Sequence, residues 1–356
     1  MAQLRLVLDQ LVSPVDSDLA DASRALLGGL VRTAPSGCDV AAIVPAGEGE
    51  ELPGVSEVRR LPLARRELSA AWQLGVARGV GAGMIHSPTL LAPLVRHDRV
   101  HDHDQIVPTV WDLRAWEDPE SLPRAVVMAQ RALLRRAVKH ADAVVVPTHS
   151  LVDRLSSIAR LGDRIRVIPG AAAPEVLVGA DAAQRRADAG VPAERIVLAG
   201  DPATLGAGFS AVAATGLDAV VLDVREGGEP EVSEIASIAG LPEARLHVRG
   251  RLSAADRAAV LGGAAAFIAT DDAGRWPWRL VEAMALSVPV VAADSDVHRD
   301  VLADGGMLVA AHDMRDAVAE ATTDARERLS VLAQDRARGF SWEGAADRVW
   351  ALHAEL

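Results

Sequence analysis

The sequence is poor in several residue types, and each scarcity excludes a class of protein. Among its 356 residues the only cysteine is Cys38, so no internal disulfide can form, which is typical of a reducing compartment. Lysine occurs once, at Lys139, and the net charge of -12 argues against a general affinity for nucleic acid. No apolar run approaches the roughly 18 residues of a membrane span, and the first residues lack a secretion signal. We therefore predict a cytoplasmic protein that binds no nucleic acid.

One segment departs from the acidic balance: RALLRRAVKH, residues 131–140, predicts a helix with a cationic face. A solvated helix surface accounts for such a face. The alternative is contact with anionic lipid headgroups or with an acidic partner, and any membrane contact would then be peripheral.

Short β-branched runs alternate with helical patterns along the chain. The runs are nearly continuous in apolar character, as is typical of strands buried on both faces of a parallel sheet. The series pauses over residues 171–194 and restarts, which predicts an α/β protein with two parallel-sheet domains and a cleft between them. The predicted strands are residues 4–9, 39–45, 83–88, 106–112, 142–148, 164–170, 195–201, 219–224, 245–250, 265–271, 288–294 and 306–311.

This pattern also predicts the domain boundaries. We expect an N-terminal, acceptor-side domain over residues 1–170 and a C-terminal, nucleotide-sugar-side domain over residues 171–338. Residues 339–356 should form a helix, capped by Ser341, that packs back on the domains.

Several longer segments resemble family 4 glycosyltransferases, which have the GT-B fold of two Rossmann-like domains and transfer a hexose from a nucleotide sugar to an acceptor. The resemblance runs nearly end to end. It rests on LVLDQLVSP (6–14), LARRELSAAW (63–72), GMIHSPTLLAPL (83–94), HADAVVVPTHSLVDRL (140–155), GDRIRVIPGA (162–171), LVEAMALSVPVVAAD (280–294) and FSWEGAADRVWALH (340–353).

The segment GRWPWRLVEA departs from the family's sugar-binding motif, E-G-F-G-L-P-x-x-E-A. Glu282 matches the second acid, which holds the nucleotide ribose in the family, although a helix N-terminal acid favoured by the macrodipole would look the same. Gly274 occupies the position of the family's first acid. Pro277, which has no N–H to donate, occupies the position of the central glycine. Trp276 and Trp278 flank the proline as a packed plug or as a platform for a sugar.

The diphosphate site is changed as well. In AGDPATLGAG, residues 199–208, the family's Arg and Lys are absent, and the resemblance leaves Gly200 as a donor-binding residue. In the other domain, Ser17 and Asp18 replace glycines whose amides approach the phosphates, with Asp16 and Asp21 beside them. Two unit charges about 4 Å apart interact at roughly 4 kcal/mol at an effective dielectric near 20, so these aspartates should repel a diphosphate. The alternative is that they hold Mg²⁺.

The remaining candidate residues also follow from the resemblance. Trp111 replaces a histidine that lines the sugar-transfer site, and the neighbouring Asp112 is kept. The backbone of Arg251 and Leu252 should face the nucleotide base, unless GRLSAADRAAV is an ordinary turn capped by its serine. His86 should lie at a strand's carboxyl end, where it contacts the acceptor or makes a loop hydrogen bond.

A histidine-rich loop, HDRVHDHDQ, invites interpretation as a metal site through His97, His101 and His103. A similar sequence occurs in the family, whose members act without a metal ion in this fold. We therefore interpret it as a polar surface loop and predict neither a metal nor a cofactor, with a nucleotide sugar as the substrate.

Two hypotheses remain. In one, the chain is an active hexosyltransferase with an altered donor-binding site. In the other, it has lost donor chemistry and serves as the partner of an active paralogous transferase. The replaced residues favour the second hypothesis, and the fold alone cannot decide between them.

Overall fold

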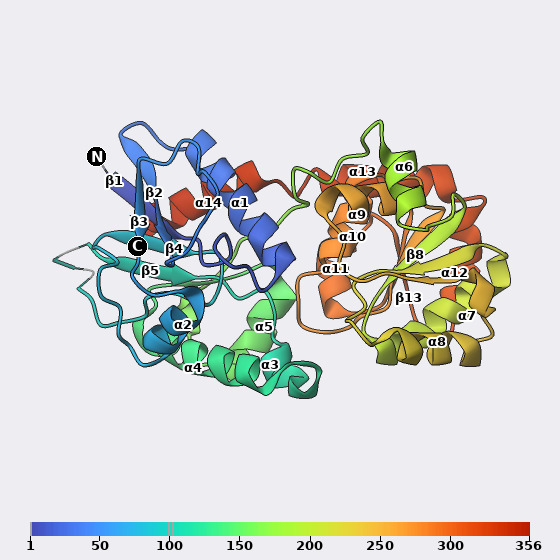
Figure 1. Ribbon diagram of the computed structural model, residues 1–356, viewed down its shortest axis with the longest axis horizontal. Helices are drawn as coiled ribbons and strands as arrows, with labels where there is room; N and C mark the ends of the chain where they lie inside the picture. Colours follow the sequence, from blue (N-terminus) through green and yellow to red (C-terminus); the bar gives the residue numbers. More distant parts are fainter. Residues whose placement is uncertain (1, 99, 102) are drawn as a thin grey trace. The chain divides into compact units, whose positions relative to one another are not determined.

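A computed structural model describes residues 2–98, 100–101 and 103–356, and its chain divides into two compact units (Figure 1). Unit 1 comprises Met1–Gly170, Ala273–Trp276 and Ser341–Leu356. Unit 2 comprises Ala171–Asp272 and Pro277–Phe340. The short segment of residues 273–276 therefore packs with unit 1, although most of the chain around it belongs to unit 2.

Unit 1 is built on a five-stranded parallel sheet of order β3-β2-β1-β4-β5. A bridge between Thr109 and Val145 links this sheet to the parallel pair β6-β7. Its strands are β1 (Ala2–Val7), β2 (Cys38–Val44), β3 (Glu57–Arg60), β4 (Met84–Ser87), β5 (Gln105–Pro108), β6 (Val144–Val146) and β7 (Ile165–Val167). Its helices are α1 (Ser17–Arg32), α2 (Arg65–Gln73), α3 (Arg114–Glu117), η1 (Pro119–Ser121), α4 (Arg124–His140), α5 (His149–Ile158), η2 (Gly162–Arg164) and α14 (Trp342–Glu355).

Unit 2 holds a six-stranded parallel sheet of order β10-β9-β8-β11-β12-β13, the doubly wound arrangement with a switch point between β8 and β11. Helices cover both faces, with α7 packed on α8 and α12, and α10 packed on α9 and α13 (Figure 1). The strands are β8 (Arg195–Ala199), β9 (Asp218–Val221), β10 (Leu246–Val248), β11 (Ala266–Ala269), β12 (Val290–Ala293) and β13 (Met307–Val309). The helices are α6 (Ala182–Asp188), η3 (Pro202–Thr204), α7 (Leu205–Thr215), α8 (Glu229–Ile238), η4 (Glu243–Arg245), α9 (Ala254–Leu261), α10 (Trp278–Ala285), α11 (Asp296–Leu302), α12 (Met314–Thr322) and α13 (Arg326–Ala337).

The apolar runs predicted as strands all contain strands, and the parallel α/β architecture is confirmed. The strand missed by the sequence analysis is β3, whose residues EVRR carry a single apolar side chain. This strand lies at the edge of its sheet and is exposed at alternate positions, so it has no buried face to leave an apolar run in the sequence. Among the described residues, no helix combines the length and apolar character needed to cross a bilayer.

Helix α14 closes unit 1 by packing against α1. The Ser341 side chain accepts a hydrogen bond from the Gly344 N–H, which confirms the predicted N-cap. The apolar stripe of Trp342, Ala345, Val349 and Leu352 is buried. The chain's last helix is thus part of the hydrophobic core of unit 1.

Two buried histidines meet where α14 covers the sheet. The rings of His86 on β4 and His353 on α14 lie edge to face with centroids 5.6 Å apart, and both side chains are almost fully buried. His353 Nδ1 lies 2.7 Å from Oε1 of Gln105, and the Gln105 amide donates to the His353 carbonyl oxygen. Burial lowers the pKa of His353 to about 4. Burial also lowers the pKa of His86 well below its usual value, and the neighbouring His353 lowers it further. Both rings are therefore neutral at pH 7.

We expect unit 1 to lose stability on mild acidification because of this pair. Each histidine takes up a proton more readily in the unfolded chain, so the stabilisation is complete above about pH 6.5 and falls as the pH drops toward the folded pKa. For His353 alone the loss should be about 2 kcal/mol at pH 5. Thermal melting at pH 7.5 and pH 5 measures it. His353→Asn, which keeps a donor for Gln105, should show a smaller difference between the two pH values, and an unchanged difference would contradict the assignment.

Candidate functional site

The segment of residues 273–276 pairs with residues 111–113 of unit 1 through an isolated antiparallel β-bridge. The Leu113 N–H donates to the Gly274 carbonyl oxygen at 2.8 Å, and the Trp276 N–H donates to the Trp111 carbonyl oxygen at 2.9 Å. Asp112 and Arg275 form an antiparallel bridge between these two bonds. The backbone that the family presents to a sugar is thus paired with protein backbone here.

Trp111 and Trp276 fill the space beside this pairing. Their rings lie edge to face with centroids 6.3 Å apart, and they are 8% and 2% exposed respectively. The Trp111 indole N–H donates to the Pro88 carbonyl oxygen at 2.7 Å, which anchors the ring to the loop after β4. Of the two interpretations of Trp276, the packed plug describes its position, because a ring with almost no exposed surface offers no face for a sugar.

Gly274 lies so close to the Glu117 carboxylate that a side chain here would displace it. Its N–H donates to Oε2 of Glu117 at 3.0 Å, and Glu117 also pairs with Arg154 at 3.0 Å. A Cβ atom placed on Gly274 would lie 2.6 Å and 2.9 Å from the two carboxylate oxygens of Glu117. An acid at this position, as the family pattern has, would therefore clash with Glu117 and repel it.

Across the next peptide bond the chain enters unit 2, where α10 begins at Trp278. Trp278 is half-buried, so the two tryptophans that looked alike in the sequence differ in their surroundings. Glu282 is the fifth residue of α10, beyond its first turn. This position weakens the interpretation of Glu282 as a helix N-terminal acid, because the macrodipole effect falls off within one turn.

Glu282 is instead the centre of an ion cluster, which we define as the buried residues Glu282, Arg257 and Arg279 together with the exposed Asp223. Nη2 of Arg257 lies 2.9 Å from Oε1 of Glu282, and Nη1 of Arg279 lies 2.7 Å from Oε2. Arg279 also contacts Asp223 at 2.6 Å. The Glu282 and Arg257 side chains are each 3% exposed, and that of Arg279 is 6% exposed. Both carboxylate oxygens of Glu282 are thus occupied by arginine, and a ribose hydroxyl would have to compete with two charged donors.

The switch point of unit 2 is closed by threonines. Gly200 follows β8, and Thr270 follows β11, which are the two strands that flank the switch point. The hydroxyls of Thr204 and Thr270 lie 3.0 Å apart, and a Cβ atom on Gly200 would lie 2.1 Å from the Thr270 hydroxyl. The glycine expected to contact the donor is therefore required in this structure by the approach of Thr270.

In unit 1 the side chain of Asp16 caps the amino terminus of α1. Oδ1 of Asp16 accepts hydrogen bonds from the N–H groups of Asp18 and Leu19, at 2.9 and 3.3 Å. Asp21 pairs with Arg24 at 3.2 Å. Amides that would serve a phosphate at a helix N-terminus are thus satisfied by an internal carboxylate.

The other predicted residues are spread over the two units. Asp112 pairs with Arg114 at 2.6 Å. In unit 2, Arg251 is exposed, and the Leu252 carbonyl oxygen accepts from Arg257 at 3.0 Å. Ser253 caps α9, so the turn interpretation of this segment describes its local structure. His86 lies within β4 rather than in a loop, and its burial against α14 removes it from contact with an acceptor in this structure.

Asp9 is a buried acid that the sequence analysis missed. It follows β1, one of the two strands at the switch point of the unit 1 sheet, and its side chain is fully buried. It accepts hydrogen bonds from Arg65 at 2.9 Å, Thr89 at 2.8 Å and Gln10 at 2.8 Å. Burial raises its pKa above the usual value, although Arg65 and Thr89 oppose the shift. The partners come from distant segments, so sequence spacing gave no signal.

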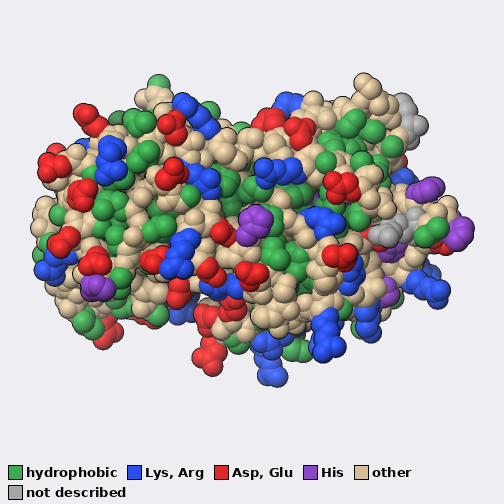
Figure 2. Space-filling view, turned by 180° about the vertical axis from the view of Figure 1, so that it is seen from behind, with side chains coloured by type: hydrophobic (Ala, Val, Ile, Leu, Met, Phe, Trp, Pro, Cys, Tyr) green, Lys and Arg blue, Asp and Glu red, His purple; other side chains and the backbone are tan. Residues whose placement is uncertain are grey.

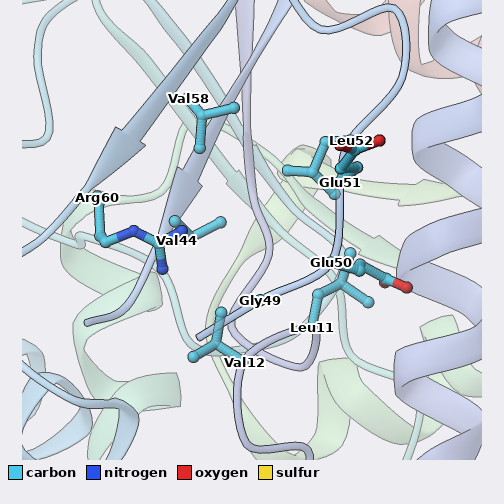
Figure 3. Close-up of a pocket in the computed structure, with 9 residues that line it drawn as sticks. All are labelled: Leu11, Val12, Val44, Gly49, Glu50, Glu51, Leu52, Val58 and Arg60. Carbon is cyan, nitrogen blue, oxygen red and sulfur yellow. The ribbon is translucent and has the colours of Figure 1, made fainter. Parts of the chain in front are cut away.

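A shallow pocket of about 220 Å³ lies in unit 1 near the carboxyl ends of β1, β2 and β3 (Figure 3). Most of its lining is apolar, and of its charged residues Glu50 pairs with Arg24 and Arg60 bonds to the Gly47 carbonyl oxygen. It could hold a small apolar group. The lining residues are Leu11, Val12, Val44, Gly49, Glu50, Glu51, Leu52, Val58 and Arg60.

Within the described part of the chain, no group of three or more His, Cys, Asp or Glu side chains could hold a metal ion. In the histidine-rich loop, His97 pairs with Asp142 at 2.8 Å and His101 pairs with Asp98 at 2.9 Å. Arg99 and Asp102 of that loop lie outside the described residues.

Comparison with known proteins agrees with this architecture. Residues 207–327 match the family described as "Glycosyl transferases group 1". No curated protein matches the sequence significantly.

Several solved structures share the fold over the whole chain. Sucrose-phosphate synthase from Thermosynechococcus elongatus is similar with a TM-score of 0.69 and 16% identity, over 100% of this chain and 99% of that one. HepE from Anabaena in complex with UDP-glucose gives 0.68 and 15%, over 100% of both chains. The catalytic domain of starch synthase IV from Arabidopsis thaliana, bound to ADP and acarbose, gives 0.67 and 13%, over 100% of this chain and 99% of that one. The fold is therefore that of GT-B glycosyltransferases, with two Rossmann-like domains.

The different surroundings of the two loop tryptophans predict different effects of their removal. Trp276→Ala should cost about 3 to 5 kcal/mol of unfolding free energy, because the ring is fully buried. Trp278→Ala is the matched control and should cost clearly less, because its ring is only half-buried. Thermal and denaturant melting of both variants measures the difference. Equal effects, or an unchanged stability of Trp276→Ala, would contradict the packed-plug assignment.

Removing the charge of Glu282 should destabilise unit 2. Glu282→Gln leaves Arg257 and Arg279 buried without their shared counter-charge, which typically costs about 3 to 5 kcal/mol. The control is Glu343→Gln, which breaks an exposed ion pair with Arg32 and should cost at most about 1 kcal/mol. Denaturant titration compares the two. If Glu282→Gln keeps wild-type stability but loses a nucleotide-induced shift in melting temperature, the residue holds a ligand instead.

Proposed function

We propose that this chain is a GT-B glycosyltransferase-fold protein that has lost nucleotide-sugar transfer and acts in glycan assembly by binding. One observation carries the proposal: residues 273–276, where the family presents an acid and bare backbone to the transferred sugar, are paired with residues 111–113 and plugged by Trp276. The partner we propose is an active paralogous transferase in the cytoplasm.

Three further features support the loss of donor binding. The segment after β8 has neither of the family's phosphate-neutralising cations. The amides at the start of α1 are capped by Asp16. Glu282, at the family's ribose-binding position, is enclosed by Arg257 and Arg279. Each change alone would be tolerable, but a donor site acts as a unit, so their effects on transfer should compound.

The second candidate is an active hexosyltransferase that binds its nucleotide-sugar donor through residues other than the family's. It is favoured by the ion cluster, because Arg257 and Arg279 bring two cations into a domain that lacks lysine. If Glu282 or Asp223 released an arginine when the donor arrived, that arginine could neutralise a phosphate. HepE, a structure with this fold, was solved with UDP-glucose, and in this chain the same class of donor would be the substrate.

Calorimetric titration of the full chain with UDP, GDP and UDP-glucose tests the proposal. We expect no binding in the micromolar range, with or without Mg²⁺, and no donor hydrolysis. Gly274→Glu, which restores the family acid, should also remain inactive, because the new side chain meets Glu117. Micromolar binding by the wild-type chain would overturn the proposal. Loss of that binding in Arg279→Gln would establish that Arg279 binds the donor. Binding only with Mg²⁺ would point to a metal site at Asp16, Asp18 and Asp21.

A further inference from the structure

The exposed face of α4 differs from the rest of this acidic protein. Arg124, Met128, Arg131, Arg135 and Lys139 recur every three or four residues and therefore lie on one face of the helix. The helix contains no acidic residue, and its opposite face is buried through Val127, Leu133, Leu134 and Ala137. The stripe extends for about 22 Å, at 1.5 Å per residue. We call these five residues the α4 stripe.

The cations of the stripe are largely uncompensated. Arg124, Arg135 and Lys139 are exposed, and no ion pair joins them to an acid of the described chain. Arg131 is half-buried and donates to the Ala115 carbonyl oxygen at 2.8 Å. Many other surface arginines do have acidic partners, as Arg24, Arg185 and Arg299 show. Figure 2 shows Lys and Arg side chains along the lower right margin, on the side of unit 1 where α4 lies.

Exposed apolar side chains accompany these charges. Met128 lies within the stripe and is 56% exposed. Leu74 and Val76, which follow α2, are 80% and 51% exposed. Gly75 between them lies against Arg136 of α4, since a Cβ atom there would be 2.5 Å from the guanidinium group. One exposed apolar group thus lies within the stripe, and two more flank a glycine that lies against the same helix.

The local electrostatics agree with a positive surface at the carboxyl end of α4. The pKa of His140 is lowered by burial, and further by the charges of Arg136, His97 and Lys139. The acids that precede the helix in the sequence, Asp118 and Glu120, come before its amino end. The Arg135–Lys139 end is therefore the more strongly cationic part.

We propose that the α4 stripe, with Leu74 and Val76, is a docking surface for an anionic lipid bilayer. A straight row of cations on one helix face matches a flat layer of anionic headgroups, while Met128, Leu74 and Val76 can enter the boundary between headgroups and acyl chains. An acidic protein would satisfy the charges but leave the apolar side chains without a role. The proposal goes beyond the function proposed above and does not depend on whether the chain transfers sugar.

Cosedimentation of the full chain with vesicles tests this surface. We expect binding to vesicles of phosphatidylcholine mixed with phosphatidylglycerol at about 0.1 M salt, and none to vesicles of phosphatidylcholine alone. The triple variant Arg124→Gln, Arg135→Gln, Lys139→Gln should bind about 100-fold more weakly, since each cation near an anionic surface contributes about fivefold. The matched control is Arg225→Gln, Arg299→Gln, Arg338→Gln, which changes the net charge equally at exposed sites of unit 2. It should bind as the wild type does.

A second variant separates lipid from a soluble polyanion. Leu74→Ser with Met128→Ser should weaken binding to anionic vesicles and leave binding to polyglutamate unchanged. Three results would overturn the proposal: no binding of the wild-type chain to anionic vesicles, an equal loss in the unit 2 control, or binding to polyglutamate without binding to vesicles. The last result would assign the stripe to an acidic protein. Melting temperatures of all variants show whether each one is folded.

Discussion

Two backbone hydrogen bonds, from Leu113 to Gly274 and from Trp276 to Trp111, fix the segment on which the rest of the site depends. Once residues 274–276 are paired in this way, the Trp276 ring is buried beside Trp111, and Gly274 is brought against Glu117. The sequence changes in this loop therefore belong together. A glycine is needed where the acid would clash, and a large ring fills the space beside the pairing.

Unit 2 shows a comparable use of a ligand-binding position for internal structure. Glu282 keeps the residue type that the family uses for ribose, but its carboxylate bonds to Arg257 and Arg279. A buried carboxylate needs such partners, because its desolvation would otherwise raise the free energy of the folded state. The residue type thus persists although the structure gives it a different role, which shows why function has to be inferred from a site and not from a motif.

Arginine is the main cation of this chain, and much of it serves the interior. Arg195 is buried and donates to the carbonyl oxygens of Val260 and Gly262, and burial lowers its pKa to about 10. Arg136 bonds in the same way to the Leu94 carbonyl oxygen. The planar guanidinium group with several donors suits such multiple bonds, whereas an ammonium group does not. Against this background Arg124, Arg135 and Lys139 of α4 stand apart, because they bond to no carbonyl group among the residues that the structure describes.

The sequence by itself determined the parallel α/β architecture, the positions of the strands other than β3, and the cap of α14. These features depend on local apolar runs and on residues a few positions apart, so they can be read without knowledge of the fold. Only the tertiary structure decided that residues 273–276 pack with unit 1, that Trp276 and Trp278 differ in burial, and that Glu282 lies between two arginines. Asp9 and Arg65 are 56 positions apart, and Gly274 and Glu117 are 157 apart. Contacts at such separations are set by how the elements pack, and the sequence pattern around each residue does not encode its partner.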